Sequence, residues 1–219
     1  MLRKYEFILL LIVPTLLFSQ GYQVGDHELL FMPTAYTMDK GSWYFSDYEL
    51  FFINLSYAPT SSTHLGVFTL FPITSDFLET ATLGIKQNVL HQSSMADAVW
   101  ATFTPKGSLF TIGDVLSIGK PANGLHLSIS AITDLNSSNK HWYAVYMAGY
   151  RYDVSKKLSL LIEYMNAQVL LDEGDFKGLL SLGVRFHVES ICWEIGGFRP
   201  LADTGDLFLI PLLKGTFLF

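Results

Sequence analysis

The stretch Leu180-Ser181-Leu182-Gly183-Val184-Arg185-Phe186-His187-Val188 decides the fold class of this chain. Its even positions are all apolar and its odd positions are polar or small. This period of two belongs to a β-strand and not to a helix, whose period is 3.6. The alternation recurs at 125–132, 158–165 and 191–196. Four such segments predict an all-β protein.

Turn-forming stretches separate these segments at short intervals. Gly, Pro, Asn, Asp and Ser gather at 120–124, 133–140, 153–157, 172–175 and 199–205, where they supply the backbone angles and local hydrogen bonds that turns require. We therefore predict an antiparallel up-and-down meander of about 12 strands, with about 10 as the alternative. The predicted strands are 28–37, 42–57, 64–71, 78–90, 95–104, 109–118, 124–133, 141–152, 158–166, 177–188, 190–199 and 206–219.

The alternation is least regular in two places. Asp47 and Glu49 share a parity with Ile53, and Asp114 shares one with Leu116. A β-bulge would shift the parity there, because it adds one residue to one strand of a pair. A misplaced strand is the other explanation.

The composition excludes several classes of protein. Half of the 219 residues are hydrophobic and 15% are aromatic, which excludes disorder. One cysteine excludes a disulfide scaffold, and 14 Lys and Arg against 20 Asp and Glu give no basic surface for nucleic acid. We therefore expect no nucleic-acid partner.

Residues 1–20 have the plan of a secretory signal peptide. Arg3 and Lys4 precede an apolar run at 7–18, which is too short to span a bilayer as a helix. We expect cleavage near Ser19 or Gln20, and an uncleaved membrane anchor is the alternative. Because nothing after the signal has the pattern of a linker or a repeat, we expect residues 21–219 to form one domain.

The polar faces of the strands favour a membrane barrel over a soluble sandwich. They carry mostly Ser, Gly and Thr, whereas a solvated face would carry many Lys and Glu. Aromatic residues gather at strand ends, as at Trp142 and Tyr143 and again at Tyr150 and Tyr152, where membrane barrels have their interfacial girdles. Most segments have about nine to 13 residues, near the length that a tilted spanning strand needs. We predict a membrane-spanning β-barrel.

The C-terminal segment 207–219 resembles the last strand of outer-membrane β-barrel proteins of diderm bacteria. It ends on an aromatic residue, and Phe217 lies on the same face as Leu213. The stretches 32–52 and 152–160 also resemble uncharacterised barrels of this kind, although Pro211 departs from an ideal terminal strand.

The resemblance implies several expectations about the protein's surroundings. It implies the cell outer membrane as location and outer-membrane lipid as surroundings. It also implies the barrel assembly machinery as a partner during biogenesis, with Phe217 and Phe219 as the assembly signal.

Parity places a charge cluster in the lumen. Arg185, Glu194, Glu163 and Lys214 face inward on neighbouring strands, and Arg185 lies across the short connection at Glu189 from Glu194. Opposite charges in a lumen of low dielectric should pair. The cluster is interpreted as ion pairs that fill and brace the lumen, with a selectivity constriction as the alternative.

Five histidines gather near one end of the predicted barrel. His64, His126 and His187 face inward near one mouth, with His27 and His91 close to that end, and such a group could bind a transition metal or sense pH. Because they lack a short ligand spacing, scattered solvated histidines are the preferred interpretation. We expect no metal and no cofactor.

The connections at the outer end offer little for catalysis. His141 lies near Ser137 and Ser138, and one loop holds Asp172, Glu173 and Asp175, but no nucleophile or metalloprotease motif is present. A serine-rich loop and a solvated acidic loop explain them. The predicted outer connections are short: 38–41, 72–77, 105–108, 134–140, 167–176 and 200–205.

The sequence therefore predicts a protein that is not an enzyme. The expected role is a structural wall protein or a narrow conduit for small solutes. The alternatives are a barrel enzyme that acts on membrane lipid and a secreted soluble β-barrel or sandwich that binds a ligand.

Overall fold

The computed structural model describes residues 23–49, 51–70, 77–138, 141–166, 177–202 and 209–219. The signal peptide predicted at 1–20 lies outside the described residues.

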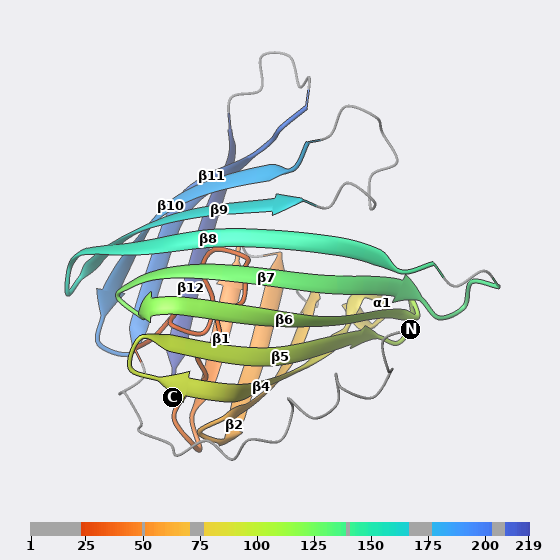
Figure 1. The fold of residues 1–219 in the computed structure, drawn as a ribbon, viewed down its shortest axis with the longest axis horizontal. Coiled ribbons are helices and arrows are strands. Elements are labelled where there is room, and N and C mark those ends of the chain that lie inside the picture. The colour runs from red at the N-terminus through yellow and green to blue at the C-terminus, as the bar shows by residue number, and fades with distance from the viewer. Residues whose placement is uncertain (1–22, 50, 71–76, 139–140, 167–176, 203–208) are drawn as a thin grey trace, which may run out of the picture.

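Twelve antiparallel strands in the described residues form one closed barrel (Figure 1). Each strand pairs with its neighbours in sequence, and β1 closes the barrel against β12, with Tyr44 opposite Leu218 and Tyr48 opposite Lys214. The all-β barrel predicted from the sequence is confirmed. The strands are β1 (Trp43–Tyr48), β2 (Phe52–Thr60), β3 (Thr63–Leu70), β4 (Thr82–Gln92), β5 (Met95–Thr104), β6 (Leu109–Lys120), β7 (Asn123–Asp134), β8 (Tyr143–Ser155), β9 (Leu158–Asn166), β10 (Leu179–Val188), β11 (Ile191–Pro200) and β12 (Ile210–Leu218).

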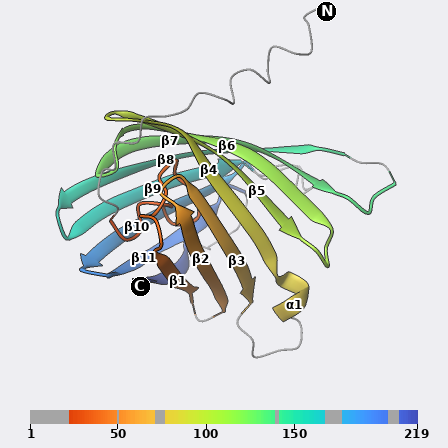
Figure 2. The same ribbon diagram turned by 90° about the horizontal axis from the view of Figure 1, so that it is seen from below.

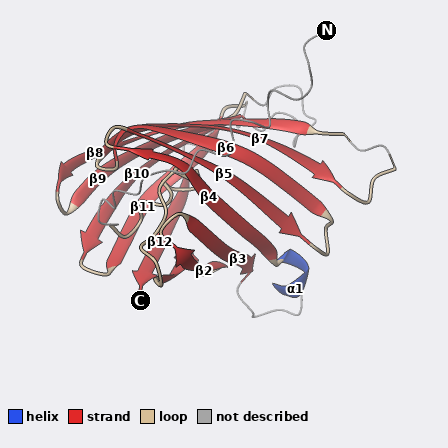
Figure 3. Ribbon diagram, turned by 60° about the horizontal axis from the view of Figure 1, so that its bottom comes forward, coloured by secondary structure: helices blue, strands red, loops and turns tan. Residues whose placement is uncertain are grey.

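Helix is nearly absent from the described residues. Figure 3 shows α1 (Phe77–Thr80), a single turn, at the end of β3. It occupies the start of the strand predicted at 78–90, so that β4 begins only at Thr82. No described helix has the length and apolar character needed to cross a membrane.

The predicted strand list contains two errors that compensate each other, so that the predicted number of strands is still correct. The segment 28–37 is not a wall strand, since it belongs to none of the twelve strands and forms an isolated bridge within itself, between Glu28 and Pro33. The predicted strand 42–57 is two strands, β1 and the first part of β2, with a turn between them in which Glu49 has a φ of 57°. Asp47 pairs directly with Ile53 without a register shift, so it shares the outer face with Ile53 and no bulge is present there.

The predicted bulge near Asp114 is also wrong. Strand β6 pairs without a register shift on both sides, and Asp114 lies opposite Ile129, whose side chain is exposed. Asp114 is therefore on the outer face of a regular strand. The bulges lie elsewhere, between Tyr57 and Thr60 and in β4 and β8.

The first predicted outer connection lies at the other end of the barrel. The N–H of Trp43 donates to the carbonyl of Phe219 at 3.2 Å, so the segment 38–41 before it belongs to the end at which the chain terminates. We call this the C-terminal end. The first connection at the opposite end is the turn around Glu49.

The polarity of the barrel is the reverse of that of a soluble protein. Inward-facing side chains such as Ser46, Ser117 and Thr216 are fully buried. Outward-facing Ile195 and Leu213 are 56% and 50% exposed. The apolar cluster within the barrel is formed largely by the segment that precedes β1, and its members are Leu29, Leu30, Met32, Ala35, Tyr36, Ala96, Ala98, Val115, Leu161 and Leu212.

Gly113 allows Trp100 to pack inside the barrel. The two residues are cross-strand partners, and a Cβ at position 113 would lie 2.7 Å from the Trp100 ring and from the Cβ of Ser130. We expect Gly113→Val to lower the free energy of unfolding by about 1–3 kcal/mol, the usual cost of overpacking. Denaturant unfolding in detergent measures it.

Gly84→Ala is the matched control. A Cβ at position 84 meets no atom closer than 3.7 Å, so this change should leave the unfolding midpoint almost unaltered. An equal loss of stability in both variants would contradict the packing argument.

Candidate functional site: the plugged lumen

Residues 23–38, called the plug from here on, enter the barrel before β1. Figures 1 and 2 show this segment, in red to orange, enclosed by the strands. Gly25 begins a tight reversal with a φ of +91°, a backbone angle that suits glycine. Inside the plug, the Leu29 N–H donates to the Met32 carbonyl and the Thr34 N–H to the His27 carbonyl, at 2.8 and 3.1 Å. Several other peptide groups of the plug take their partners from the wall.

Arg185, from β10, provides several of those partners. Its guanidinium donates to the carbonyl of Gly25 at 2.7 Å and to the carbonyls of Glu28 and Leu29 at 2.7 and 3.0 Å. Its Nε donates to Glu194 on β11, with which it forms an ion pair. Both charged side chains are fully buried. Arg185 thus binds the plug and is neutralised by the wall.

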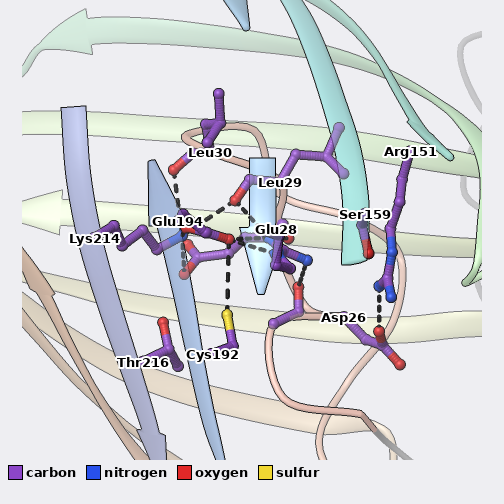
Figure 4. A network of polar contacts seen from close by, with 12 residues as sticks. Asp26, Glu28, Leu29, Leu30, Arg151, Ser159, Cys192, Glu194, Lys214 and Thr216 are labelled. Atoms are coloured by element: carbon purple, nitrogen blue, oxygen red, sulfur yellow. Dashed lines mark hydrogen bonds and ion pairs between the residues drawn. The ribbon is translucent and has the colours of Figure 1, made fainter. Parts of the chain in front are cut away.

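Lys214, from β12, completes this cluster. Its Nζ lies 3.0 Å from Glu194 and 2.8 Å from Glu28 of the plug, and it donates to the carbonyls of Leu29 and Leu30 at 3.1 and 3.3 Å. Figure 4 shows Lys214, Glu194 and Glu28 grouped against the plug backbone. One wall carboxylate and one plug carboxylate therefore share the same ammonium group.

Arg151, from β8, holds the first turn of the plug. Its Nη1 lies 2.5 Å from Asp26, while its Nε donates to Asp153 of its own strand at 2.8 Å. Its Nη2 donates to the Gln23 side chain at 3.1 Å. Figure 4 shows Arg151 directed at Asp26, away from the Lys214 group.

Glu163, from β9, binds N–H groups of the plug backbone, whereas cationic side chains of the wall bind its carbonyl groups. Its carboxylate accepts the N–H groups of Phe31 at 3.1 Å and of Met32 at 3.2 Å. Lys86 and Asn88 of β4 hold the far side: Lys86 donates to the carbonyls of His27 and Thr34, and Asn88 to that of Ala35. Wall side chains thus satisfy both donors and acceptors of an irregular buried segment, as buried backbone requires.

The structure brings together three of the four lumen charges named from the sequence. Arg185, Glu194 and Lys214 are in contact, whereas Glu163 is buried near them but binds plug N–H groups. Sequence reasoning missed Arg151 and Lys86 as parts of the same system.

The plug itself was also missed, although a local signal was present. Residues 29–32 are four successive apolar residues without alternation, and Pro33 follows them. That pattern does not fit a strand with one polar face, and proline would remove a ladder donor.

The inward histidines do not converge on a metal site. His64, His126 and His187 are buried inside the barrel, but His126 contacts Ser117 and His187 contacts Arg151 and Ser159. Among the described residues, no three His, Cys, Asp or Glu side chains are grouped to hold a metal ion. The acidic loop at 172–175 lies outside the described residues.

The terminal aromatic residues lie on the outer wall. The Phe217 ring contacts Phe45 and Trp193, at centroid distances of 6.4 and 5.7 Å. Phe219 is 74% exposed, and its backbone pairs with that of Trp43. Their part in assembly stays a prediction.

Burial shifts the titration of plug residues, which do not belong to the strands. It lowers the pKa of His27 to about 4, although the neighbouring Glu28 carboxylate opposes the shift. Burial alone would raise the pKa of Glu28, but the Lys214 ammonium group holds that pKa well below its ordinary value. The docked plug therefore contains a neutral histidine beside an ionised glutamate.

The plug leaves part of the lumen unfilled. A cavity of about 290 Å³ lies between His27, Glu28 and Phe31 on the plug side and the wall formed by β1 to β5 and Met147 of β8. Its polar lining includes Lys86 and other side chains of the wall.

No protein-family model matches the chain, and no curated protein matches it either. Solved structures resemble its fold. One, described as "Unveiling the Mechanism Behind the in-meso Crystallization of Membrane Proteins", is 10% identical with a TM-score of 0.50 and covers 82% of this chain and 83% of its own. A mutant Rh. blastica porin is 10% identical, covers 90% of this chain and 68% of its own, and has a TM-score of 0.44.

A further structure, described as "Asymmetric conductivity of engineered proteins", is 12% identical with a TM-score of 0.42. It covers 77% of this chain, which spans 55% of that structure's length. At such identities the similarity concerns the fold alone.

Removing the Arg185 guanidinium should destabilise the plugged barrel. Arg185→Met leaves the carbonyls of Gly25 and Glu28 without their charged donor and halves the cationic charge beside Glu194. Breaking a buried ion pair in this way costs about 3–5 kcal/mol. Denaturant unfolding in detergent measures the loss. Lys157→Met, at an exposed turn, is the control and should change stability by less than about 0.5 kcal/mol. Similar values for both variants would contradict a bracing role for Arg185.

Acidification should weaken docking of the plug through His27. The ordinary pKa of 6.5 applies to the unfolded chain and about 4 to the folded one, so the unfolded state binds more protons between these values. The contribution is complete above pH 6.5 and is lost as pH falls to 4, amounting to roughly 3 kcal/mol. His27→Gln should flatten this part of the stability profile, measured by unfolding from pH 7 to 4. His141→Gln, at an exposed position, should retain the wild-type profile; a flattened profile there would refute the assignment to His27.

Proposed function

We propose that this chain is an outer-membrane β-barrel protein whose lumen is held closed by its own plug. Its role is non-enzymatic, as a wall protein or as a narrow conduit for small solutes that rests in the closed state. The single observation that supports this is the inverted polarity of the barrel. Leu213 and Ile195 face outward while the charged side chains of Arg185, Glu194 and Lys214 are buried inside.

A lipid bilayer is the solvent that suits this outer face. Water would disfavour so many exposed apolar side chains, whereas hydrocarbon favours them and requires a closed ladder without edges. Aromatic side chains occur near both ends: Trp43 and Phe219 lie at the C-terminal end, and Phe51 and Trp142 at the other. An even number of strands places the start of β1 and the end of β12 at the same end, which we assign to the periplasm.

The plug argues against a permanently open pore. It occupies the lumen and is bound through cations from β8, β10 and β12, with the Arg185 ion pair at its centre. Solute passage along the axis would need displacement of plug residues or passage beside them. A closed conduit and a structural wall protein both fit this arrangement, and conductance separates them.

Heat-dependent gel mobility tests the membrane barrel. A closed barrel resists detergent at room temperature, so unheated protein extracted from membranes should migrate differently from boiled protein. Soluble chain recovered from the aqueous periplasm, with a single mobility, would refute the proposal.

Conductance in planar bilayers tests closure of the lumen. Wild-type protein should give little current, while deletion of residues 23–36 should give open channels because it removes the plug and leaves β1 intact. Arg185→Met should show intermittent openings, and Lys157→Met should behave as wild type. Large steady channels in the wild type would overturn the closed state. A silent deletion variant that retains barrel mobility would exclude the conduit and leave the wall protein.

A further inference from the structure

The lumen cavity described above occupies the half of the barrel that the plug does not fill. It extends from His27 and Lys86 to Phe68 and Thr82. Phe68 and Thr82 are cross-strand partners at the end of the barrel opposite the C-terminal end. The cavity therefore reaches from the plug toward the mouth that the proposed orientation places outside the cell.

Lys86 brings to this cavity a basic side chain without a carboxylate partner. It is 8% exposed, and its Nζ donates to the carbonyls of His27 and Thr34 at 2.8 and 3.0 Å. In the part of the chain that the structure describes, no carboxylate lies within ion-pair distance of it. Arg151, Arg185 and Lys214 each have at least one. Of these four buried basic side chains of the lumen, Lys86 is therefore the one without a carboxylate partner among the described residues.

The acid that lines the cavity is already committed elsewhere. Glu28 receives Lys214 at 2.8 Å and His27 at 3.0 Å on one oxygen, and the Tyr48 hydroxyl donates to its other oxygen at 3.0 Å. The negative charge of Glu28 is therefore already balanced by these contacts. A cationic ligand would find no open carboxylate there, whereas an anion would find Lys86.

Two further polar atoms in the lining have no hydrogen-bond partner among the described residues. They are Nε2 of His64, a side chain that is 94% buried, and Nε1 of Trp100. The indole nitrogen can only donate, and the imidazole nitrogen donates in one of its tautomers. Buried polar groups are normally paired. Together with Lys86, these atoms fit a ligand that supplies hydrogen-bond acceptors.

The remaining lining includes the polar side chains of Asn54, Ser56, Thr82 and Thr102 and a larger apolar and aromatic part. Phe31, Phe68, Trp100 and Met147 contribute large side chains. Next to Phe68 on the same wall, Gly66 pairs directly with Gly84, which keeps that part of the wall free of side chains. The cavity thus combines one cationic end with an apolar body, as specific ligand sites usually do.

We propose that this cavity binds a small carboxylate with an apolar body. The carboxylate accepts hydrogen bonds from Lys86 and His64, and the apolar body lies between Phe68, Trp100 and the Gly66–Gly84 wall. This inference deepens the proposed function by naming a ligand class, and it rests on the plugged barrel. Binding does not require that the barrel conducts.

Calorimetric titration of the full-length protein in a non-ionic detergent tests the proposal, with 4-phenylbutyrate as the probe. We expect saturable binding of one molecule per chain, and binding of the uncharged 4-phenylbutanol at least about tenfold weaker, because it lacks the charge-assisted bond. Equal binding of acid and alcohol, or no saturable binding of the acid, would overturn the proposal.

Two variants locate the site. Gly84→Leu places a side chain in the cavity without touching a plug contact, and it should abolish binding. Lys86→Gln should weaken binding of the acid by about tenfold and bring it close to that of the alcohol, because the charge-assisted bond is lost. Lys157→Gln, at an exposed turn, should bind like the wild type. Undiminished binding to Gly84→Leu would place the probe on the micelle or the outer wall and would refute the cavity as its site.

Gel mobility of every variant separates this inference from the proposed function. If the wild type shows no heat-dependent mobility shift, the result contradicts the membrane barrel itself. A protein that shows the shift but does not bind the probe retains the barrel and loses only the ligand site.

Discussion

The arrangement inside this barrel depends on the pairing of buried wall cations with the backbone of the plug. An irregular segment in the middle of a barrel has no ladder to satisfy its peptide groups, and each unpaired group costs about 1–3 kcal/mol. Arg185 alone donates hydrogen bonds to three of the plug carbonyls, and Glu194 neutralises the Arg185 charge across the β10–β11 pair. Lys214 then uses the second oxygen of Glu194 and two more carbonyls. Without the wall charges, these plug carbonyls would be buried without partners, and only the apolar contacts of the plug would hold it in the lumen.

The same requirement explains why the charges face inward in a chain with so apolar an outer surface. Strand alternation assigns every second residue to the lumen, and small residues such as Ser159 and Ser181 leave room for the plug and for long side chains. An ionised side chain could be tolerated there only with a partner of opposite charge or with backbone dipoles. The plug supplies both, since it carries Asp26 and Glu28 as well as its carbonyls. The plug therefore fills the lumen and neutralises the charges of the wall at the same time.

The parts of this design that are local in sequence could be predicted, and the rest could not. Regular alternation placed Arg185 and Glu194 in the lumen because a short turn joins their strands and no bulge intervenes. The sequence predicts a strand where the plug lies, because the partners of the plug are remote in sequence: Glu163 is 132 residues from Phe31. Lys86 escaped notice because a register shift between Asn88 and Leu90 changes the parity within β4. Neither the position of a bulge nor a polar contact between remote residues can be read from the alternation of apolar and polar residues.

The two halves of the barrel wall have different tasks. Strands β8 to β12 supply the ion pairs that bind the plug, and β2 to β5 supply Gly66, Gly84 and a cation without a carboxylate partner. A lumen of 12 strands is wider than one that its own side chains fill, so a plug bound to one half leaves space along the other. A large side chain at Gly84, where a Cβ meets no atom closer than 3.7 Å, would enter that space, and the sequence does not place one there. The cavity thus results from the position at which the wall holds the plug, and Lys86 makes the cavity favour anionic ligands.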